Sequence, residues 1–215
     1  MIKGVIFDMD GVLVDNMDIH REVFALFCAR YGVDDWRTKF ERVAGMGNDE
    51  IMAMLMPAEL IAERGIKSLG DEKEALYREV YAATITPIAG LKELLASLKA
   101  EGKLIAVGSS GCKENVEFVL NSCGISEYFD ALVYSDLVTR CKPDPEIYSM
   151  AISLLGLEPK ECLIFEDAIA GITAAKRANV AKIIAITTTY DRETLERESD
   201  ADQIIDRYAE VIGKI

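Results

Sequence analysis

Short runs of apolar residues recur along the chain and predict the strands of a sheet. The runs are short, rich in β-branched side chains and separated by longer, more polar segments. They cover residues 2–7, 104–108, 131–134, 162–165 and 182–187, with a weaker run at 203–205. Runs of this length and content are typical of strands that are buried on both faces of a parallel sheet.

The segments between these runs carry the spacing of amphipathic helices. Apolar side chains recur at intervals of three and four residues over 91–98, 116–123 and 147–155, and a glycine follows each stretch where a C-terminal cap belongs. From about residue 85 onward, helices therefore alternate with strands. This order predicts an α/β fold with a doubly wound, Rossmann-like parallel sheet.

Residues 16–84 interrupt the alternation, because they contain helical patterns and no convincing strand. A simple crossover between parallel strands needs only about a dozen residues. We therefore expect an α/β core formed by residues 1–15 and 85–215, with residues 16–84 inserted as an α-helical cap subdomain. Asp15 is expected to cap the first helix of this insertion.

Charge and cysteine content narrow the partners and the compartment. The formal net charge is −13, and this negative field argues against nucleic acid and anionic membranes as partners. The five cysteines are scattered and lack metal-binding spacing, which indicates reduced thiols. The acid at Asp8 comes too early for an apolar signal-peptide core. We therefore expect a cytoplasmic protein that is a monomer or a weak oligomer.

Polar residues with matching chemistry follow four of the predicted strands. Carboxyl ends of strands in an open α/β sheet meet at one edge, where ligands bind. The residues placed there are Asp8, Asp10, Ser109, Lys142, Glu166 and Asp167. Four carboxylates and one lysine need more positive charge, and a hard divalent cation with oxygen ligands supplies it. The pattern predicts a Mg²⁺ site and metal-assisted phosphoryl chemistry.

These segments resemble the four motifs of the haloacid dehalogenase superfamily. The first is FDMDGVLVD at residues 7–15, and Ser109 after its strand is similar to the second. Lys142 within CKPDPEIY resembles the third, and the acidic pair within IFEDAIAGI resembles the fourth. The order and spacing match across the whole chain, including a helical cap after the first motif. The subgroup with the greatest likeness contains β-phosphoglucomutase and related small-molecule phosphatases.

The resemblance implies catalytic roles for four residues. Asp8 corresponds to the nucleophile that forms an aspartyl-phosphate, and Asp10 to the general acid and base. Ser109 would donate a hydrogen bond to a phosphoryl oxygen. Lys142 would orient the nucleophile and offset the developing charge.

The resemblance also implies the Mg²⁺ ligands. They would be the carboxylates of Asp8 and Asp167 and the backbone carbonyl of Asp10. Glu166 would be either a further ligand or a hydrogen-bond acceptor behind the ligands.

Substrate contacts are expected from the cap and from the segment after Ser109. Ser110 and Gly111 would offer backbone N–H groups. His20, on the first cap helix, is equally consistent with a structural role and with substrate contact. Gly45 and Asn48 belong to the stretch that resembles the specificity loop of β-phosphoglucomutase.

That stretch bears on the choice between a phosphatase, which hydrolyses a phosphosugar, and a mutase, which moves the phosphoryl group to another position of the sugar. A mutase must grip a second phosphate with a cation, but Asn48 stands where an arginine is expected. Lys73 and Lys113 are further cations that the sequence alone does not place. We therefore favour hydrolysis of a small phosphomonoester, such as a sugar phosphate. A β-phosphoglucomutase-type mutase is the alternative, followed by a pyrophosphatase or a non-catalytic ligand-binding protein.

Overall fold

The computed structural model describes residues 1–40 and 47–215 of the chain. Within this part, six parallel strands form one sheet in the order β3-β2-β1-β4-β5-β6. The strands are β1 (Gly4–Phe7), β2 (Leu104–Gly108), β3 (Ala131–Val133), β4 (Cys162–Glu166), β5 (Lys182–Ile186) and β6 (Gln203–Ile205). They coincide with the six apolar runs to within two residues. The predicted doubly wound α/β fold is confirmed.

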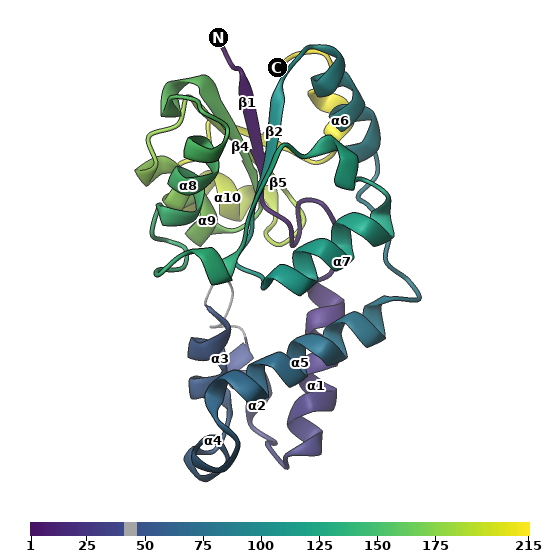
Figure 1. Ribbon diagram of the computed structural model, residues 1–215, viewed down its shortest axis with the longest axis vertical. Coiled ribbons are helices and arrows are strands. Elements are labelled where there is room, and N and C mark those ends of the chain that lie inside the picture. Colours follow the sequence, from purple (N-terminus) through teal and green to yellow (C-terminus); the bar gives the residue numbers. More distant parts are fainter. Residues whose placement is uncertain (41–46) are drawn as a thin grey trace.

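Helices cover both faces of this sheet (Figure 1). One face carries α6 (Leu91–Ala100) and α7 (Lys113–Cys123), and the other carries α8 (Glu146–Leu154), α9 (Ile169–Arg177) and α10 (Arg192–Glu198). The alternation of side chains along β1 serves both layers, since Val5 and Phe7 pack with α6 and α7 whereas Ile6 packs with α8 and α9. Short 3₁₀ helices complete the connections: η1 (Ser126–Tyr128), η2 (Ser135–Leu137), η3 (Pro159–Glu161) and η4 (Tyr208–Glu210).

Between β1 and α6, the regular elements of the described residues are all helices, joined by turns and loops. Its helices are α1 (Met17–Arg30), α2 (Trp36–Phe40), α3 (Asn48–Leu55), α4 (Ala58–Arg64) and α5 (Ile66–Tyr81). Figure 1 shows most of this region at the end of the molecule away from both termini, with α1 beside α5. It has an apolar cluster of its own, which includes Phe27, Met52 and Leu69. This cluster supports the predicted division into core and cap, which stays a prediction.

The start of α1 differs from the expectation. The N-cap is Asn16, which makes no side-chain capping bond, and Asp15 is exposed. The Asn16 side chain is occupied elsewhere, in the site described below. In the described residues, no helix combines the length and the apolar character that a membrane crossing requires.

Candidate active site

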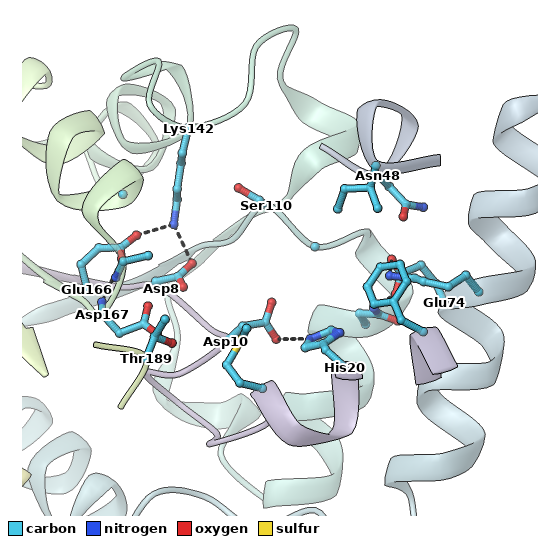
Figure 2. Close-up of a pocket in the computed structure, with 18 residues that line it drawn as sticks. Asp8, Asp10, His20, Asn48, Glu74, Ser110, Lys142, Glu166, Asp167 and Thr189 are labelled. Carbon is cyan, nitrogen blue, oxygen red and sulfur yellow. Dashed lines mark hydrogen bonds and ion pairs between the residues drawn. The ribbon is translucent and has the colours of Figure 1, made fainter. Parts of the chain in front are cut away.

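A pocket lies between the carboxyl end of the sheet and the helices α1, α3 and α5 (Figure 2). The strand order changes direction between β1 and β4, which is where open α/β sheets bind ligands. Asp8 follows β1, and Glu166 and Asp167 stand at the end of β4. The structure therefore brings together carboxylates that are about 160 residues apart in the chain.

The carboxylates of Asp8, Glu166 and Asp167 form a buried cluster. Each offers an oxygen atom within 4.8 Å of the others. Burial raises the pKa of Asp8 to about 7, and Glu166 and Asp10 add to the rise although Lys142 opposes it. Burial and the charges of Glu166 and Asp8 also raise the pKa of Asp167 well above its ordinary value. The cluster therefore holds more negative charge than its surroundings compensate.

Lys142 supplies the positive charge inside this cluster. Its Nζ atom lies 2.6 Å from Oδ1 of Asp8 and 2.7 Å from Oε1 of Glu166. Burial alone would lower the pKa of Lys142, but these two carboxylates raise it above its ordinary value. The loop that carries Lys142 is fixed by Glu146, which accepts hydrogen bonds from the backbone and hydroxyl of Thr139. Lys142 is thus held as a charged group against Asp8.

Glu166 has both oxygens occupied by donors. Oε1 accepts from Lys142 and from the Tyr148 hydroxyl at 2.7 Å each, and Oε2 accepts from the backbone N–H groups of Asp167 and Ala168 at 2.9 Å each. Burial would raise the pKa of Glu166, but Lys142 and the other donors hold it below its ordinary value. Of the two roles open from the sequence, this bonding favours an acceptor that positions Lys142. Tyr148, the last residue of CKPDPEIY, was not identified as a site residue from the sequence.

Two glycines make room for these carboxylates. A Cβ atom on Gly171 of α9 would lie 1.6 Å from Oε1 of Glu166. A Cβ on Gly11, whose φ is +76°, would lie 1.9 Å from Oδ2 of Asp167. The cluster therefore depends on close approach of backbone at both positions.

Asp10 faces the cap rather than the lysine. Asn16 Nδ2 donates to Asp10 Oδ1 over 2.6 Å and also lies 2.7 Å from the Tyr77 hydroxyl oxygen, while His20 Nε2 is 3.6 Å from the same Asp10 oxygen. Burial would raise the pKa of Asp10, but the interactions with His20 and Asn16 hold it below its ordinary value. The His20 ring stacks on Tyr77 at 4.6 Å between centroids and also lines the pocket. Asn16 carries no motif signal and was not identified from the sequence.

The segment after β2 places its two serines differently. Ser109 is fully buried, and its Oγ accepts a hydrogen bond from Gly111 N over 3.0 Å. Ser110 and Gly111 line the pocket, whereas Ser109 is not among the lining residues in the described structure. The Ser110 hydroxyl is buried there without a hydrogen-bond partner among the described residues. Phosphoryl contact by Ser109 stays a prediction, and of these two serines it is Ser110 that lines the pocket.

Besides His20, three polar side chains from the cap reach the pocket. Asn48 at the start of α3, and Lys73 and Glu74 on α5, all line the pocket. Lys113 lies on α7, half-exposed, 3.6 Å from Glu117, and is not a lining residue of the described pocket. Gly45 lies outside the described residues, so its predicted substrate contact stays untested.

The residues at the carboxyl end of the sheet fit a hard divalent cation. Asp8 and Asp167 present buried carboxylate oxygens, and the pKa of each is raised. A bound cation would therefore stabilise the ionised form of both carboxylates. Mg²⁺ prefers oxygen donors and commonly takes one or two protein carboxylates together with phosphate oxygens. A Mg²⁺ ion would thus complete a donor set that is already assembled.

Comparison with known proteins agrees with this geometry. Residues 2–179 match the family model of the haloacid dehalogenase-like hydrolases. The chain is 34% identical over 218 residues to validoxylamine A 7′-phosphate phosphatase of Streptomyces hygroscopicus subsp. limoneus, covering 98% of this chain and 96% of that protein. It is 30% identical over 188 residues to a phosphorylated carbohydrates phosphatase of Thermotoga maritima, covering 86% and 85%.

A solved structure is similar over almost the whole chain. CbbY from Rhodobacter sphaeroides, in complex with xylulose-(1,5)bisphosphate, superposes with a TM-score of 0.86 at 28% identity, covering 98% of this chain and 96% of that one. The family match, the relatives and the fold all agree with the motifs. The chain therefore belongs to the haloacid dehalogenase-like hydrolases.

Proposed function

We propose that the protein is a Mg²⁺-dependent phosphatase that hydrolyses a small phosphomonoester, such as a sugar phosphate, through an aspartyl-phosphate on Asp8. The observation that carries this proposal is the 2.6 Å contact between Lys142 Nζ and Asp8 Oδ1 inside a buried carboxylate cluster, with Asp10 beside it. The names of two relatives, a validoxylamine A 7′-phosphate phosphatase and a phosphorylated carbohydrates phosphatase, support the substrate class.

The first chemical step transfers the phosphoryl group to the protein. A carboxylate oxygen of Asp8 attacks phosphorus, and the bond from phosphorus to the ester oxygen breaks as the new bond forms. The free protein holds Asp10 ionised, and the negative charge of a bound phosphoester would favour its protonation. Protonated Asp10 then donates its proton to the departing oxygen, so that the alcohol leaves neutral. Lys142 fixes the Asp8 carboxylate and offsets negative charge that gathers in the transition state. Ser109 and the Ser110–Gly111 backbone would hold phosphoryl oxygens.

The second step releases phosphate. Asp10, now ionised, accepts a proton from a water molecule, and the water oxygen attacks phosphorus. The bond to Asp8 breaks, which regenerates the free carboxylate and inorganic phosphate. A Mg²⁺ ion held by Asp8, Asp167 and the Asp10 carbonyl would supply charge neutralisation for the phosphoryl oxygens.

A phosphosugar mutase is the second candidate, because the same core serves both reactions. One observation favours it: Lys73, which the sequence could not place, lines the pocket from the cap. In a mutase, a sugar hydroxyl rather than water would attack the aspartyl-phosphate. A non-catalytic binding protein ranks lower, since every residue of the proposed mechanism is present and the carboxylates are assembled. A pyrophosphatase on the same core also ranks lower, since two relatives are named as phosphatases of validoxylamine A 7′-phosphate and of phosphorylated carbohydrates. In each case the proposed partner is a small phosphorylated metabolite, and the proposed setting is a cytoplasmic monomer or weak oligomer.

The test is phosphate release from p-nitrophenyl phosphate and from a panel of sugar phosphates, with and without Mg²⁺. Asp8→Asn should lower turnover by about 10³-fold or more, since removal of a nucleophile abolishes covalent catalysis. Asp15→Asn is the matched control, because Asp15 is exposed on the same loop and should leave turnover unchanged. Conversion of β-glucose 1-phosphate to the 6-phosphate with little free phosphate would establish the mutase instead. Full activity of Asp8→Asn would overturn the mechanism.

A further inference from the structure

The cap side of the pocket holds a buried ion pair. Lys73 and Glu74 are consecutive residues of α5, are 3% and 8% exposed, and both line the pocket. Lys73 Nζ contacts Oε1 of Glu74 and lies 5.0 Å above the ring of Phe24. Because the two charges are opposite and in contact, this pair presents no net charge to a ligand.

Glu74 is fixed from the core domain as well. Asn115 on α7 donates from Nδ2 to Oε2 of Glu74 over 2.7 Å. Arg78 Nη1 donates to Oδ1 of the same amide over 2.7 Å, which sets the orientation of Asn115. Arg78 is not among the lining residues of the described pocket. The Asn115 amide therefore lies between the Arg78 guanidinium and the Glu74 carboxylate. With both carboxylate oxygens engaged, Glu74 stays beside Lys73 and keeps its charge compensated.

The pocket also offers two neutral polar atoms without partners. Among the described residues, Asn48 Oδ1 and Ser110 Oγ are buried and accept or donate no hydrogen bond. Both residues line the pocket, and Figure 2 shows Asn48 on the same side as Glu74, away from Glu166 and Asp167, with Ser110 between Asn48 and Lys142. Buried polar atoms of this kind are normally satisfied, and a bound hydroxyl group is a suitable partner for each.

We infer that this half of the pocket binds the uncharged, hydroxyl-rich part of a phosphomonoester, and that Glu74 is the specificity-determining residue that disfavours a second phosphate. A second phosphate placed here would meet the Glu74 carboxylate, and the Lys73 charge it needs is already paired. Specificity of this kind comes from a repulsive group as much as from attractive ones. The inference rests on the proposed phosphatase function and narrows its substrate class to polyol monophosphates.

The experiment compares kcat/KM for glucose 6-phosphate and glucose 1,6-bisphosphate, measured as released phosphate. The wild-type protein should prefer the monophosphate. Glu74→Gln removes the negative charge and keeps an oxygen that accepts from Asn115, so the ratio should shift toward the bisphosphate by about 10-fold or more. Glu79→Gln is the matched control, since Glu79 is exposed on the same helix, and it should leave the ratio unchanged.

A second variant keeps the inference testable if Glu74→Gln does not fold. Asn48→Arg adds a cation to the same half of the pocket and should also shift the ratio toward the bisphosphate. A wild-type protein that prefers the bisphosphate, or a ratio that neither variant changes, would overturn the inference. Turnover of p-nitrophenyl phosphate in the same preparations tests the proposed phosphatase function separately from this inference, because this ester has no second phosphate and no sugar hydroxyl. If neither it nor a sugar phosphate is hydrolysed, the proposed function fails, and this inference fails with it.

Discussion

Asn16 donates from its side-chain amide to Oδ1 of Asp10 over 2.6 Å, at the junction of the first strand loop and α1. The same nitrogen lies 2.7 Å from the Tyr77 hydroxyl oxygen on α5. One amide therefore links the proposed general acid and base to two helices of the cap. The residue at the helix N-cap position serves the site instead of capping the helix.

Replacing this donor should slow the reaction. Asn16→Leu is nearly isosteric and leaves Asp10 without its amide partner. A hydrogen bond to a charged group contributes about 1.5–3 kcal/mol, so kcat should fall by about 10- to 100-fold. Tyr77→Phe is the companion variant, because it removes the other contact of the amide and keeps the one to Asp10. Its effect on kcat should be much smaller, and equal effects of the two variants would contradict the role assigned to Asn16.

Gly171→Ala should destabilise the protein, although alanine is the better helix former. In an open helical site the change from glycine to alanine stabilises by about 0.5–1 kcal/mol. Here the added Cβ would lie 1.6 Å from Glu166 Oε1, so Glu166 must move and release Lys142. We expect a lower free energy of unfolding, by about 1–3 kcal/mol, together with lower turnover. Urea unfolding measures whether the free energy of unfolding falls or rises. A stabilised variant would show that Glu166 is not confined against residue 171.

Removing one carboxylate of the cluster should separate metal binding from folding. The raised pKa of Asp167 means that ionising this carboxylate costs more free energy in the folded protein than in the unfolded chain. Asp167→Asn should therefore raise the thermal midpoint when a chelator is present. Mg²⁺ should raise the midpoint of the wild-type protein, because it binds the folded state, and should do so far less in the variant. Differential scanning fluorimetry measures both, and equal Mg²⁺ shifts would exclude Asp167 as a ligand.

Asp130 should make stability depend on pH away from the site. Burial would raise the pKa of Asp130, but hydrogen bonds from Lys99 and from Ile105 N hold it below its ordinary value of 3.8. A lowered pKa contributes stability that is present above the unfolded value and lost as pH falls through the folded one.

The wild-type protein should therefore be more stable than Asp130→Asn at about pH 6, and this difference should shrink at about pH 3. Urea midpoints at the two pH values measure it. Asp200→Asn, an exposed aspartate elsewhere on the core, is the control and should show little difference at either pH. A stability difference between wild type and Asp130→Asn that is the same at both pH values would mean that Asp130 acts through packing alone.

Much of the fold follows from local pattern. Strands buried on both faces need continuous apolar runs, and helices that cover a sheet need an apolar stripe, so both can be identified from residue spacing. Asp8, Lys142 and Asp167 were found the same way, because residues at the carboxyl ends of parallel strands meet at one edge. The likeness to the haloacid dehalogenase motifs added their roles and is confirmed at the level of the family.

The remaining features depend on contacts between distant segments. Asn16, Tyr148 and Gly171 act on the site through side chains and space contributed by other elements, and no local spacing signals such contacts. Lys73 illustrates the difference most clearly. Its charge is visible in the sequence, but its place in the pocket and its compensation by Glu74 come from the way α5 packs on α1 and α7.

The sequence by itself determined which segments form strands and helices, which face of each is buried, and which reactive groups stand at the strand ends. Those properties depend on the nearest few residues and on the fixed geometry of a parallel sheet. Only the tertiary structure decided which charges are paired, which serine lines the pocket, and which backbone must lack a Cβ atom. Electrostatic and steric effects act across distances of a few ångströms in space, whatever the separation along the chain.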